Sequence, residues 1–412
     1  MNYSPSRRDL LALPVALGLT ACVHGGGRAS GRNSEYTARL EKLREDLPKL
    51  ADYAAESIPG FQVACVLDGE VKWSQGYGFS ARNSGHPVHQ HVDQHTVFDL
   101  GSLTKPLFAA AVMRLRDKGV LDLNAPLISY FDYPDVRGQD AASKVTARHV
   151  LSHTTGLPNW RPFRSGSPLE FQAAPGEGFG YSGEGFFWLQ RTVEELTGIP
   201  AARLVRQEIL DPLGLDRSSL VFEPRFEANY AQGHRQQGEP GIDSYNKQSA
   251  DRVRRILHLE QGDLQDVSHA EARRALIADD PKLAPAPTPV LYPANMAGSL
   301  QATAADYARF MTAFMADSAR SLLSAATVAE MLSPQTAINP YTACGLGWRI
   351  EQTRAGKAFW HSGYNDGFHS YALGDPAGRF GVVILTNSDR GDQLRWPVVN
   401  GATGYGSAAI LS

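Results

Sequence analysis

The sequence of 412 residues has few of the features that mark several classes of protein. It contains only three cysteines, so at most one disulfide can form within the chain. Its net charge is −3 and no run of lysine and arginine with interleaved aromatics occurs, which argues against a nucleic-acid-binding surface. The apolar stretch at 10–20 is too short to span a bilayer and contains Pro14. The remaining composition, 42% hydrophobic, fits one large globular domain or two closely packed ones.

The first residues are typical of an export signal. Arg7 and Arg8 precede the apolar stretch, which fits a secretory signal peptide, and their setting resembles a twin-arginine signal. The stretch ends in Leu19-Thr20-Ala21-Cys22, which resembles the lipobox of bacterial lipoproteins. This resemblance implies cleavage before Cys22 and attachment of a lipid to it. The alternative is a signal peptide that is cut elsewhere, with Cys22 incidental.

These features predict where the protein works and where its folded part begins. Residues 1–21 would be a lipoprotein signal peptide, and 22–35, which is rich in glycine, a flexible tether. We expect the mature protein to be exported and anchored to a membrane through lipidated Cys22, facing the periplasm or the cell exterior.

The two other cysteines are Cys65 and Cys344. Both have apolar, strand-like surroundings and lie far apart in the sequence. A disulfide between them is conceivable in an oxidising compartment, but we favour two buried thiols.

Hydrophobic periodicity predicts strands near the two ends of the chain and helices between them. Strands at 61–67 and 71–79 are joined by Asp68-Gly69, which is a strong hairpin signal. Residues 222–292 are the least regular part, and we assign no chemistry to them. The helices are expected at 33–57, 107–115, 186–196, 271–278 and 296–316, with Ser268 and Thr303 as caps, and the late strands at 347–351, 357–361, 370–373 and 380–387.

The pair Ser102 and Lys105 is the first candidate for catalysis. A serine hydroxyl needs a neighbouring base and a positive potential before it can attack a carbonyl. At the start of a helix, residues i and i+3 share a face, and the unpaired N–H groups add partial positive charge. The Lys105 amine can therefore reach the Ser102 hydroxyl. Taken alone, this short motif is common, and a capped helix with a solvated lysine also explains it.

Tyr181-Ser182-Gly183 is the second candidate segment. The phenol of Tyr181 could relay a proton if it lay beside Ser102 and Lys105, because a cationic neighbour favours the phenolate. Taken alone, Tyr181 is better explained as a packing residue. His153, at an apolar helix end, is interpreted as a structural hydrogen-bonding residue instead of a base.

Two histidine-containing segments complete the candidates. His361-Ser362-Gly363 lies at a strand end, and its glycine suggests a backbone that another group approaches closely. A loop also holds four histidines without companion Cys or Glu residues at ligand spacing, so we expect a polar surface loop and no metal site or cofactor. These histidines are His86, His89, His91 and His95.

Together, the segments at Ser102, Tyr181 and His361 occur in the order and at the separations of the three motifs of penicillin-recognising serine enzymes. The chain resembles the branch that contains class C β-lactamases, D-alanyl-D-alanine carboxypeptidases, D-aminopeptidases and related esterases, over residues 36–395. The similarity includes the flanking segments 98–105, 151–158 and 298–306. It implies an α+β fold, with an antiparallel sheet covered by helices beside a mostly helical region at about 102–330. Residues 396–412 would be a C-terminal tail.

The resemblance also implies a role for each motif residue. Ser102 would be the nucleophile that forms an acyl-enzyme, and Lys105 and Tyr181 would share the general-base work as a coupled pair. The backbone N–H groups of Ser102 and Tyr364 would hold the oxyanion. Substrate would be bound by the residues at the second and third motifs, namely Gly183, His361, Ser362 and Gly363.

Two departures from the pattern narrow the expected substrate. His361-Ser362-Gly363 replaces Lys-Thr-Gly, so a fixed cation for a substrate carboxylate is weaker. Gly183 replaces the asparagine whose amide would bind an acylamino group. We therefore expect a hydrolase of small-molecule or peptide substrates, D-peptidase-like or esterase-like. A true β-lactamase, or a non-catalytic binding lipoprotein on the same fold, is the alternative.

Overall fold

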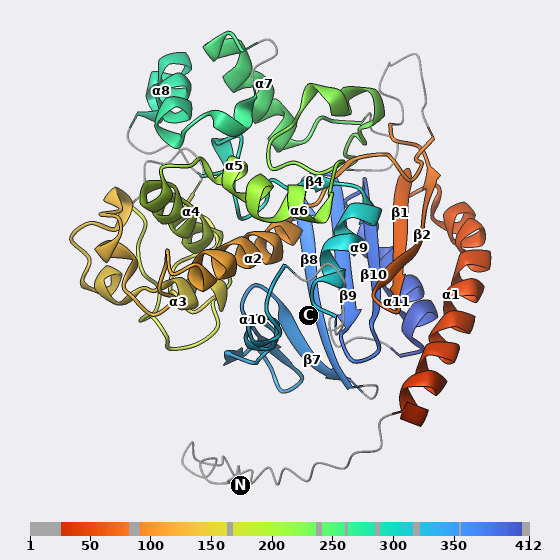
Figure 1. Cartoon of the computed structure of the whole chain (residues 1–412). Helices are drawn as coiled ribbons and strands as arrows, with labels where there is room; N and C mark the ends of the chain where they lie inside the picture. Colours follow the sequence, from red (N-terminus) through yellow and green to blue (C-terminus); the bar gives the residue numbers. More distant parts are fainter. Residues whose placement is uncertain are drawn as a thin grey trace, which may run out of the picture.

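The computed structural model describes residues 26–81, 91–162, 168–235, 241–259, 263–284, 289–315, 322–353 and 356–405. Within these ranges, one large antiparallel sheet lies beside a mostly helical region (Figure 1). This arrangement is the α+β architecture that the sequence predicts.

The sheet joins the two ends of the chain. Its eight strands follow the order β2-β1-β10-β9-β8-β7-β6-β5, so the early strand β1 pairs with the late strand β10 (Figure 1). In the predicted hairpin turn, Asp68 and Gly69 have φ values of +56° and +74°, which two-residue hairpin turns require. A separate short pair is formed by β3 and β4. The strands are β1 (Gly60–Leu67), β2 (Glu70–Gly78), β3 (Phe98–Asp99), β4 (Gln301–Ala302), β5 (Thr336–Ala337), β6 (Thr342–Cys344), β7 (Arg349–Thr353), β8 (Gly356–Asn365), β9 (Phe368–Asp375) and β10 (Phe380–Thr386).

The helical region is built around α2, whose first residues from Thr104 to Met113 are all buried. A helical segment that is buried on every side must be surrounded by other elements. Helix α5 packs beside α2, and the ring of Phe186 on α4 lies near that of Phe108 on α2 (Figure 1). The helices are α1 (Gly26–Ala54), α2 (Thr104–Asp117), α3 (Ala147–Leu151), α4 (Gly183–Thr197), α5 (Ala201–Val205), α6 (Asp211–Leu213), α7 (Tyr245–Leu257), α8 (His269–Asp279), α9 (Ala304–Thr312), α10 (Ala325–Met331) and α11 (Arg395–Thr403).

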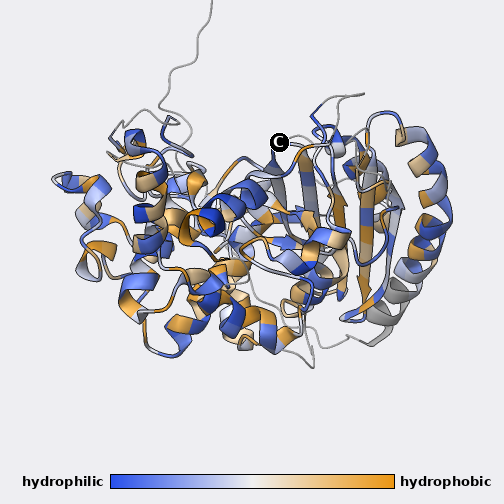
Figure 2. Ribbon diagram, turned by 90° about the horizontal axis from the view of Figure 1, so that it is seen from above, coloured by the Kyte–Doolittle hydropathy of each residue, from blue (hydrophilic) through white to orange (hydrophobic). Residues whose placement is uncertain are grey.

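The two faces of the sheet pack into different cores, because successive residues of a strand point to opposite faces. In β1, Phe61, Val63 and Cys65 lie in the core under α1 and α11, whereas Ala64 and Val66 lie in the larger core shared with α9 and the helical region. The outer side of α1, the long helix at the right of Figure 2, is largely hydrophilic, as expected of a helix that covers a sheet. Cys65 is a buried free thiol, and so is the distant Cys344, which confirms the prediction.

The prediction of a flexible tether is wrong from residue 26 onward, since α1 begins at Gly26. The buried face of this helix, which includes Tyr36, Leu40 and Leu47, packs under the sheet. Once packing has nucleated a helix, extending it costs little per residue, so the helix continues toward the N-terminus. Residues 1–25, with the expected signal peptide and Cys22, lie outside the described residues. No helix in the described ranges is both long and apolar enough to cross a membrane.

The prediction of a tail from residue 396 is wrong as far as Thr403. Val398, Val399 and Ala402 are buried in the core under α1, as part of α11. Pro397 obscured the helical pattern, but it lies in the first turn, where no intrahelical N–H bond is lost. Residues 406–412 lie outside the described ranges.

Residues 222–292 are more regular than the sequence indicated, because they contain α7 and α8. The predicted capping box of α8 is confirmed: the Glu271 N–H donates to Ser268 Oγ at 3.3 Å, and the Ser268 N–H donates to the Glu271 carboxylate at 2.9 Å. Thr303 caps α9 as predicted, but residues 296–302, which were expected to be helical, precede the helix: 296–298 form a turn, and β4 follows at 301–302.

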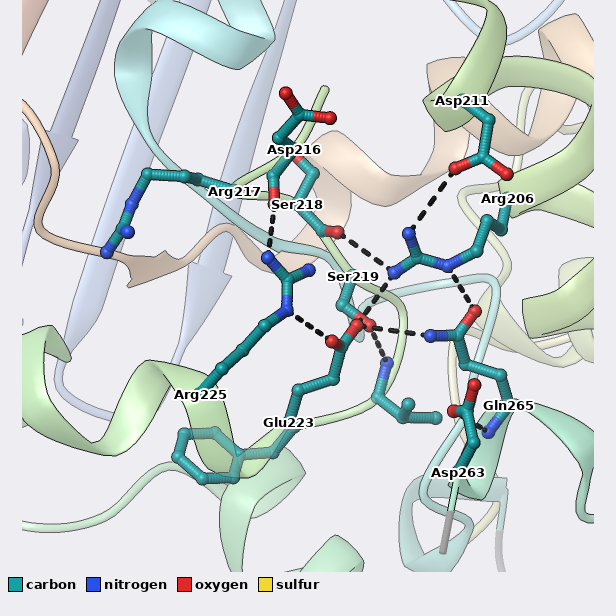
Figure 3. A network of polar contacts seen from close by, with 12 residues as sticks. Arg206, Asp211, Asp216, Arg217, Ser218, Ser219, Glu223, Arg225, Asp263 and Gln265 are labelled. Carbon is teal, nitrogen blue, oxygen red and sulfur yellow. Dashed lines mark hydrogen bonds and ion pairs between the residues drawn. The ribbon is translucent and has the colours of Figure 1, made fainter. Parts of the chain in front are cut away.

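A polar network ties this part of the chain to the segment after α5 (Figure 3). The Glu223 carboxylate accepts hydrogen bonds from Arg206 at 2.7 Å and from the Gln265 amide at 3.1 Å, and it also pairs with Arg225. Because Glu223 and Arg206 are mostly buried, water screens this network little. It adds to the apolar contacts of this segment, in which Phe222, Phe226 and Leu264 belong to the same core as the helical region.

The burial of α11 generates a stability prediction. Val398→Ala removes two methyl groups from the core under α1, and we expect a loss of about 1–3 kcal/mol in the free energy of unfolding. Urea unfolding of the variant measures this loss. Asn400→Ala, an exposed change on the same helix, is the control and should leave the midpoint almost unchanged. Equal midpoints for the two variants would show that α11 is not part of the folded domain.

Candidate active site

Ser102 and Lys105 meet at the start of α2, as the i, i+3 spacing predicts. Ser102 lies in a short 3₁₀ turn, Gly101–Leu103, that runs directly into the helix. Lys105 is 1% exposed, and its Nζ lies 3.0 Å from Ser102 Oγ and 2.6 Å from the carbonyl oxygen of Ala297. Among the described residues no carboxylate pairs with this amine. The amine is therefore held by neutral oxygens only.

Tyr181 completes the predicted cluster from the N-terminal end of α4. Its phenol is hydrogen-bonded to Ser102, and its ring centroid lies 4.8 Å from Lys105 Nζ. The next residue, Ser182, is the N-cap of α4 and accepts a hydrogen bond from the N–H of Gly185 at 2.9 Å. The cap fixes the end of the helix and with it the position of the preceding phenol.

Burial determines which of these groups titrates near neutral pH. Desolvation, followed by the nearby Arg349 guanidinium, lowers the pKa of Lys105 to about 7. Desolvation raises the pKa of Tyr181 to about 12, although the bond to Ser102 and the charge of Arg349 oppose this shift. Burial therefore opposes the effect of the cationic neighbours on Tyr181, and it favours the neutral amine of Lys105 and the protonated phenol of Tyr181.

His153 has the structural role that the sequence indicates. It is buried, its Nδ1 accepts the N–H of Ser182 at 3.1 Å, and its ring stacks on Tyr181 with centroids 4.3 Å apart. Burial holds the pKa of this imidazole well below its usual range, so the ring is neutral. It supports Tyr181 from behind and does not touch Ser102.

The third motif lies on β8 against the serine turn. A Cβ at Gly363 would lie 2.0 Å from the carbonyl oxygen of Leu100, so only glycine lets the strand approach this closely. A Cβ at Gly101, which has a φ of +50°, would likewise lie 2.8 Å from the backbone nitrogen of Tyr364. The backbones at Ser102 and Tyr364 are thus neighbours. That their N–H groups hold an oxyanion stays a prediction.

His361 is buried in this strand and neutral. Its Nδ1 lies 2.6 Å from the carbonyl oxygen of Ser362, to which it donates. Burial, then the charges of Arg349 and Lys105, hold its pKa well below the usual range. His361 and Ser362 both line the cavity in front of Ser102, so the three predicted motifs meet in one place.

Arg349 is the cation that the sequence analysis missed. It lies on β7 opposite Trp360, and its guanidinium lies over the rings of Phe179, at 5.3 Å, and Tyr181, at 5.7 Å. It lines the cavity, and its buried Nε has no hydrogen-bond partner among the described residues. Only the register between β7 and β8 brings this side chain to the site. The neutral His361 agrees with the expectation of a weaker cation at the third motif, and Arg349 adds a cation to the same cavity from the neighbouring strand.

Asp99 is a second missed residue, buried directly behind the serine turn. Its carboxylate accepts hydrogen bonds from the Gly101 N–H at 3.1 Å, from Asn365 Nδ2 at 2.7 Å and from Asn246 Nδ2 at 2.6 Å. Both amides also donate to the carbonyl of Gly298, the residue after Ala297. Burial raises the pKa of Asp99 to about 6, although these donors oppose the shift. One carboxylate thus joins the serine turn to β8, α7 and the loop that holds Lys105.

The cavity in front of Ser102 has a volume of about 1060 Å³. Its walls come from the sheet, from the loop before α4 and from α7, so it lies where the two regions meet. Among the described residues no group of three or more His, Cys, Asp or Glu side chains could hold a metal ion. Two of the four loop histidines, His86 and His89, lie outside the described ranges.

Comparison with known proteins agrees with this geometry. A model of the Beta-lactamase family matches residues 40–398. The chain belongs to the Beta-lactamase family. Members of this family are serine hydrolases.

Named relatives of this family member have several activities. Esterase EstB of Burkholderia gladioli is 32% identical over 196 residues, which cover 40% of this chain and 48% of that protein. Unguisins hydrolase ungD of Aspergillus violaceofuscus is 24% identical over 80% of this chain and 58% of its own length. Penicillin-binding protein 4* of Bacillus subtilis is 24% identical over 42% of this chain and 41% of its own. The chain thus spans about half the length of the curated relatives that it matches.

Solved structures share the fold of this family member. The octameric penicillin-binding protein homologue from Pyrococcus abyssi has a TM-score of 0.65 at 20% identity, covering 90% of this chain and 77% of that chain. A class C beta-lactamase has a TM-score of 0.65 at 18% identity, covering 93% and 100%.

The position of Arg349 generates a prediction about Lys105. Because the guanidinium lowers the pKa of the amine, Arg349→Gln should raise it, and the lysine should stay charged to higher pH. Titration of the ¹³C-labelled lysine side chains by NMR, with Lys105→Arg for assignment, measures the shift. Arg395→Gln removes another cavity-lining cation and is the control. An unchanged Lys105 titration in Arg349→Gln would contradict the electrostatic role.

Asp99 generates a second prediction. In Asp99→Asn the new amide directs an NH₂ group at one of the donors that now bond the carboxylate, which leaves buried polar groups unpaired. We expect a loss of about 1–3 kcal/mol in the free energy of unfolding, together with slower acylation of Ser102. Chemical denaturation and labelling kinetics measure the two effects. Asp392→Asn, an exposed change at the same cavity, should alter neither, and matching results for both variants would refute the role of Asp99.

Proposed function

We propose that this protein is an exported hydrolase that cleaves an ester or amide bond through an acyl-enzyme on Ser102. The observation that carries the proposal is the buried Lys105 amine, 3.0 Å from Ser102 Oγ and with a pKa lowered to about 7. An uncharged amine at this distance can remove the serine proton near neutral pH, which a solvated lysine cannot do. A site without catalytic function has no physical reason to keep a lysine whose burial removes the hydration of its amine.

The proposed reaction assigns each proton. Neutral Lys105 takes the proton of Ser102 as Oγ attacks the substrate carbonyl, and the N–H groups of Ser102 and Tyr364 hold the resulting oxyanion. The phenol of Tyr181, which keeps its proton, donates it to the leaving group and recovers one from Lys105. Water then attacks the acyl-enzyme by the same route in reverse, which releases the acid and restores Ser102.

Esters are the first substrate class that we propose. Gly183 has no side-chain amide with which to hold an acylamino group. The site therefore lacks one feature that recognises peptides and β-lactams. A relative over part of the chain is named an esterase, which agrees with this preference. True β-lactamase activity is the weaker alternative for the same reason.

D-Peptides are the second candidate, and Arg349 is the observation that favours them. A guanidinium without a carboxylate partner among the described residues, on the wall of the cavity, suits a substrate that ends in a carboxylate. A non-catalytic binding lipoprotein is a further alternative. For the export and lipid attachment of the protein at Cys22, the support is the signal-like sequence alone.

The test of the proposed function is acyl-enzyme trapping on the mature protein. We expect p-nitrophenyl esters to be turned over and to leave a transient adduct that mass spectrometry locates on Ser102. Ser102→Ala should lose both turnover and adduct, while Ser129→Ala, an exposed serine outside the cavity, should keep both.

The outcomes separate the candidates. A stable adduct from a fluorescent penicillin at Ser102 would favour D-peptides or β-lactams over esters. Full ester turnover in Ser102→Ala would refute the proposed mechanism. If the wild-type protein neither turns over the esters nor forms an adduct with the penicillin, the binding-protein alternative would be favoured.

A further inference from the structure

The ring of Trp160, from another loop, packs directly against Gly183. A Cβ built on Gly183 would lie between 2.4 and 2.7 Å from three atoms of the Trp160 ring, which is too close for any real side chain. The indole therefore occupies the space into which an asparagine at this position would extend. The absent asparagine side chain does not leave an opening in the wall, because an aromatic surface takes its place.

The residue before Trp160 is anchored to the first turn of α4. The N–H of Gly183 donates to Asn159 Oδ1 at 3.0 Å, and the N–H of Glu184 donates to the Asn159 carbonyl at 3.0 Å. These are N–H groups that a helix start leaves without intrahelical partners. Asn159 thus satisfies them and fixes the backbone beside the indole.

The residue after Trp160 is anchored more strongly. Arg161 and Glu184 are almost fully buried and form a bidentate pair, with Nε to Oε1 at 2.9 Å and the second bond at 2.7 Å. Arg161 also pairs with Asp135 at 2.7 Å. A planar, two-bond ion pair of this kind sets an orientation as well as a position. With both neighbours fixed, Trp160 has little freedom to leave Gly183.

Trp160 is half-buried and lines the same cavity as Ser102 and Lys105. On the same cavity lie Pro289 and Tyr245, the latter 50% exposed at the start of α7. Apolar and aromatic surface is thus available beside the nucleophile, where the asparagine of related enzymes would bind the acyl part of a substrate. Such a surface binds mainly through the apolar area that it buries and through ring stacking.

We propose that Trp160, held on Gly183, forms a subsite for an apolar and preferably aromatic acyl group. This inference rests on the proposed function, because it names the substrate class of the same serine. The substrates would be esters or amides whose acyl part carries a ring or a branched apolar group. Asn159 and Arg161 would be positioning residues for this subsite.

The test compares two esters that differ only in the acyl group, p-nitrophenyl acetate and p-nitrophenyl phenylacetate. In Trp160→Ala we expect kcat/KM for the phenylacetyl ester to fall by about 10-fold or more relative to the acetyl ester, as for other apolar subsites. Trp160→Phe should keep most of the preference. Trp396→Ala, which removes a 49% exposed tryptophan on α11 outside this cavity, is the matched control. An unchanged ratio in Trp160→Ala would overturn the subsite.

Binding separates failure of the subsite from failure of the proposed reaction. Calorimetry would measure methyl phenylacetate binding to Ser102→Ala, with and without Trp160→Ala. Binding that depends on Trp160, in a protein that hydrolyses neither ester, would uphold the subsite and overturn the reaction. If both esters are turned over and Trp160→Ala leaves the ratio of their kcat/KM values unchanged, the reaction would be upheld and the subsite overturned. If the protein neither hydrolyses the esters nor binds methyl phenylacetate, both the reaction and the subsite would be overturned.

The packing itself has its own test. Gly183→Asn should lower the thermal unfolding midpoint clearly in the wild-type background and much less in Trp160→Ala, because the second change removes the ring that blocks the new side chain. The same loss in both backgrounds would show that Trp160 and Gly183 are not complementary.

Discussion

The burial of the Lys105 amine is the constraint on which the rest of the site depends. A charged ammonium in this position would have no carboxylate among the described residues to offset its desolvation, so burial favours the neutral amine. The same burial keeps the proton on Tyr181, because a phenolate would also lose its hydration. Burial thus favours the uncharged form of both groups, and in the proposed reaction this makes Lys105 the base and Tyr181 the acid. Arg349 adds to the effect of burial on Lys105 and opposes its effect on Tyr181, because a nearby positive charge disfavours the ammonium and favours the phenolate.

A site that excludes water needs lining segments that stay packed together. In this protein these segments lie far apart in the sequence. Asp99 gathers the serine turn, β8, α7 and the loop at Gly298, with both asparagine amides bonded to acceptors on two segments. Every donor at this carboxylate is itself buried or half-buried, so loss of one bond would leave unpaired polar groups. Residues 222–292, which looked irregular in the sequence, therefore contribute to the site through Asn246 on α7.

The two departures from the family pattern are each matched by a residue elsewhere in the chain. The lysine absent from position 361 has a counterpart in Arg349 on the neighbouring strand, and the asparagine absent from position 183 has one in Trp160. Neither counterpart has the same functional group as the residue that is absent. Arg349 places a guanidinium on β7 in place of an ammonium on β8, and Trp160 places an indole where a side-chain amide would lie. In the proposed function, these changes alter which substrates fit, while Ser102 is kept as the attacking group.

The sequence by itself determined the local features of this protein. The hairpin at Asp68-Gly69, the capping box at Ser268 and the i, i+3 contact between Ser102 and Lys105 depend on residues a few positions apart, whose geometry the backbone dictates. Tertiary structure alone decided that Arg349 lies over Tyr181, that Asp99 binds Asn246 and Asn365, and that Trp160 fills the space at Gly183. It also decided the pKa values, because desolvation depends on everything that packs around a group. The start of α1 at Gly26 and the whole of α11 belong to the same category: glycines in the first and a proline in the second obscure the helical pattern, and α1 and α11 pack together under the sheet.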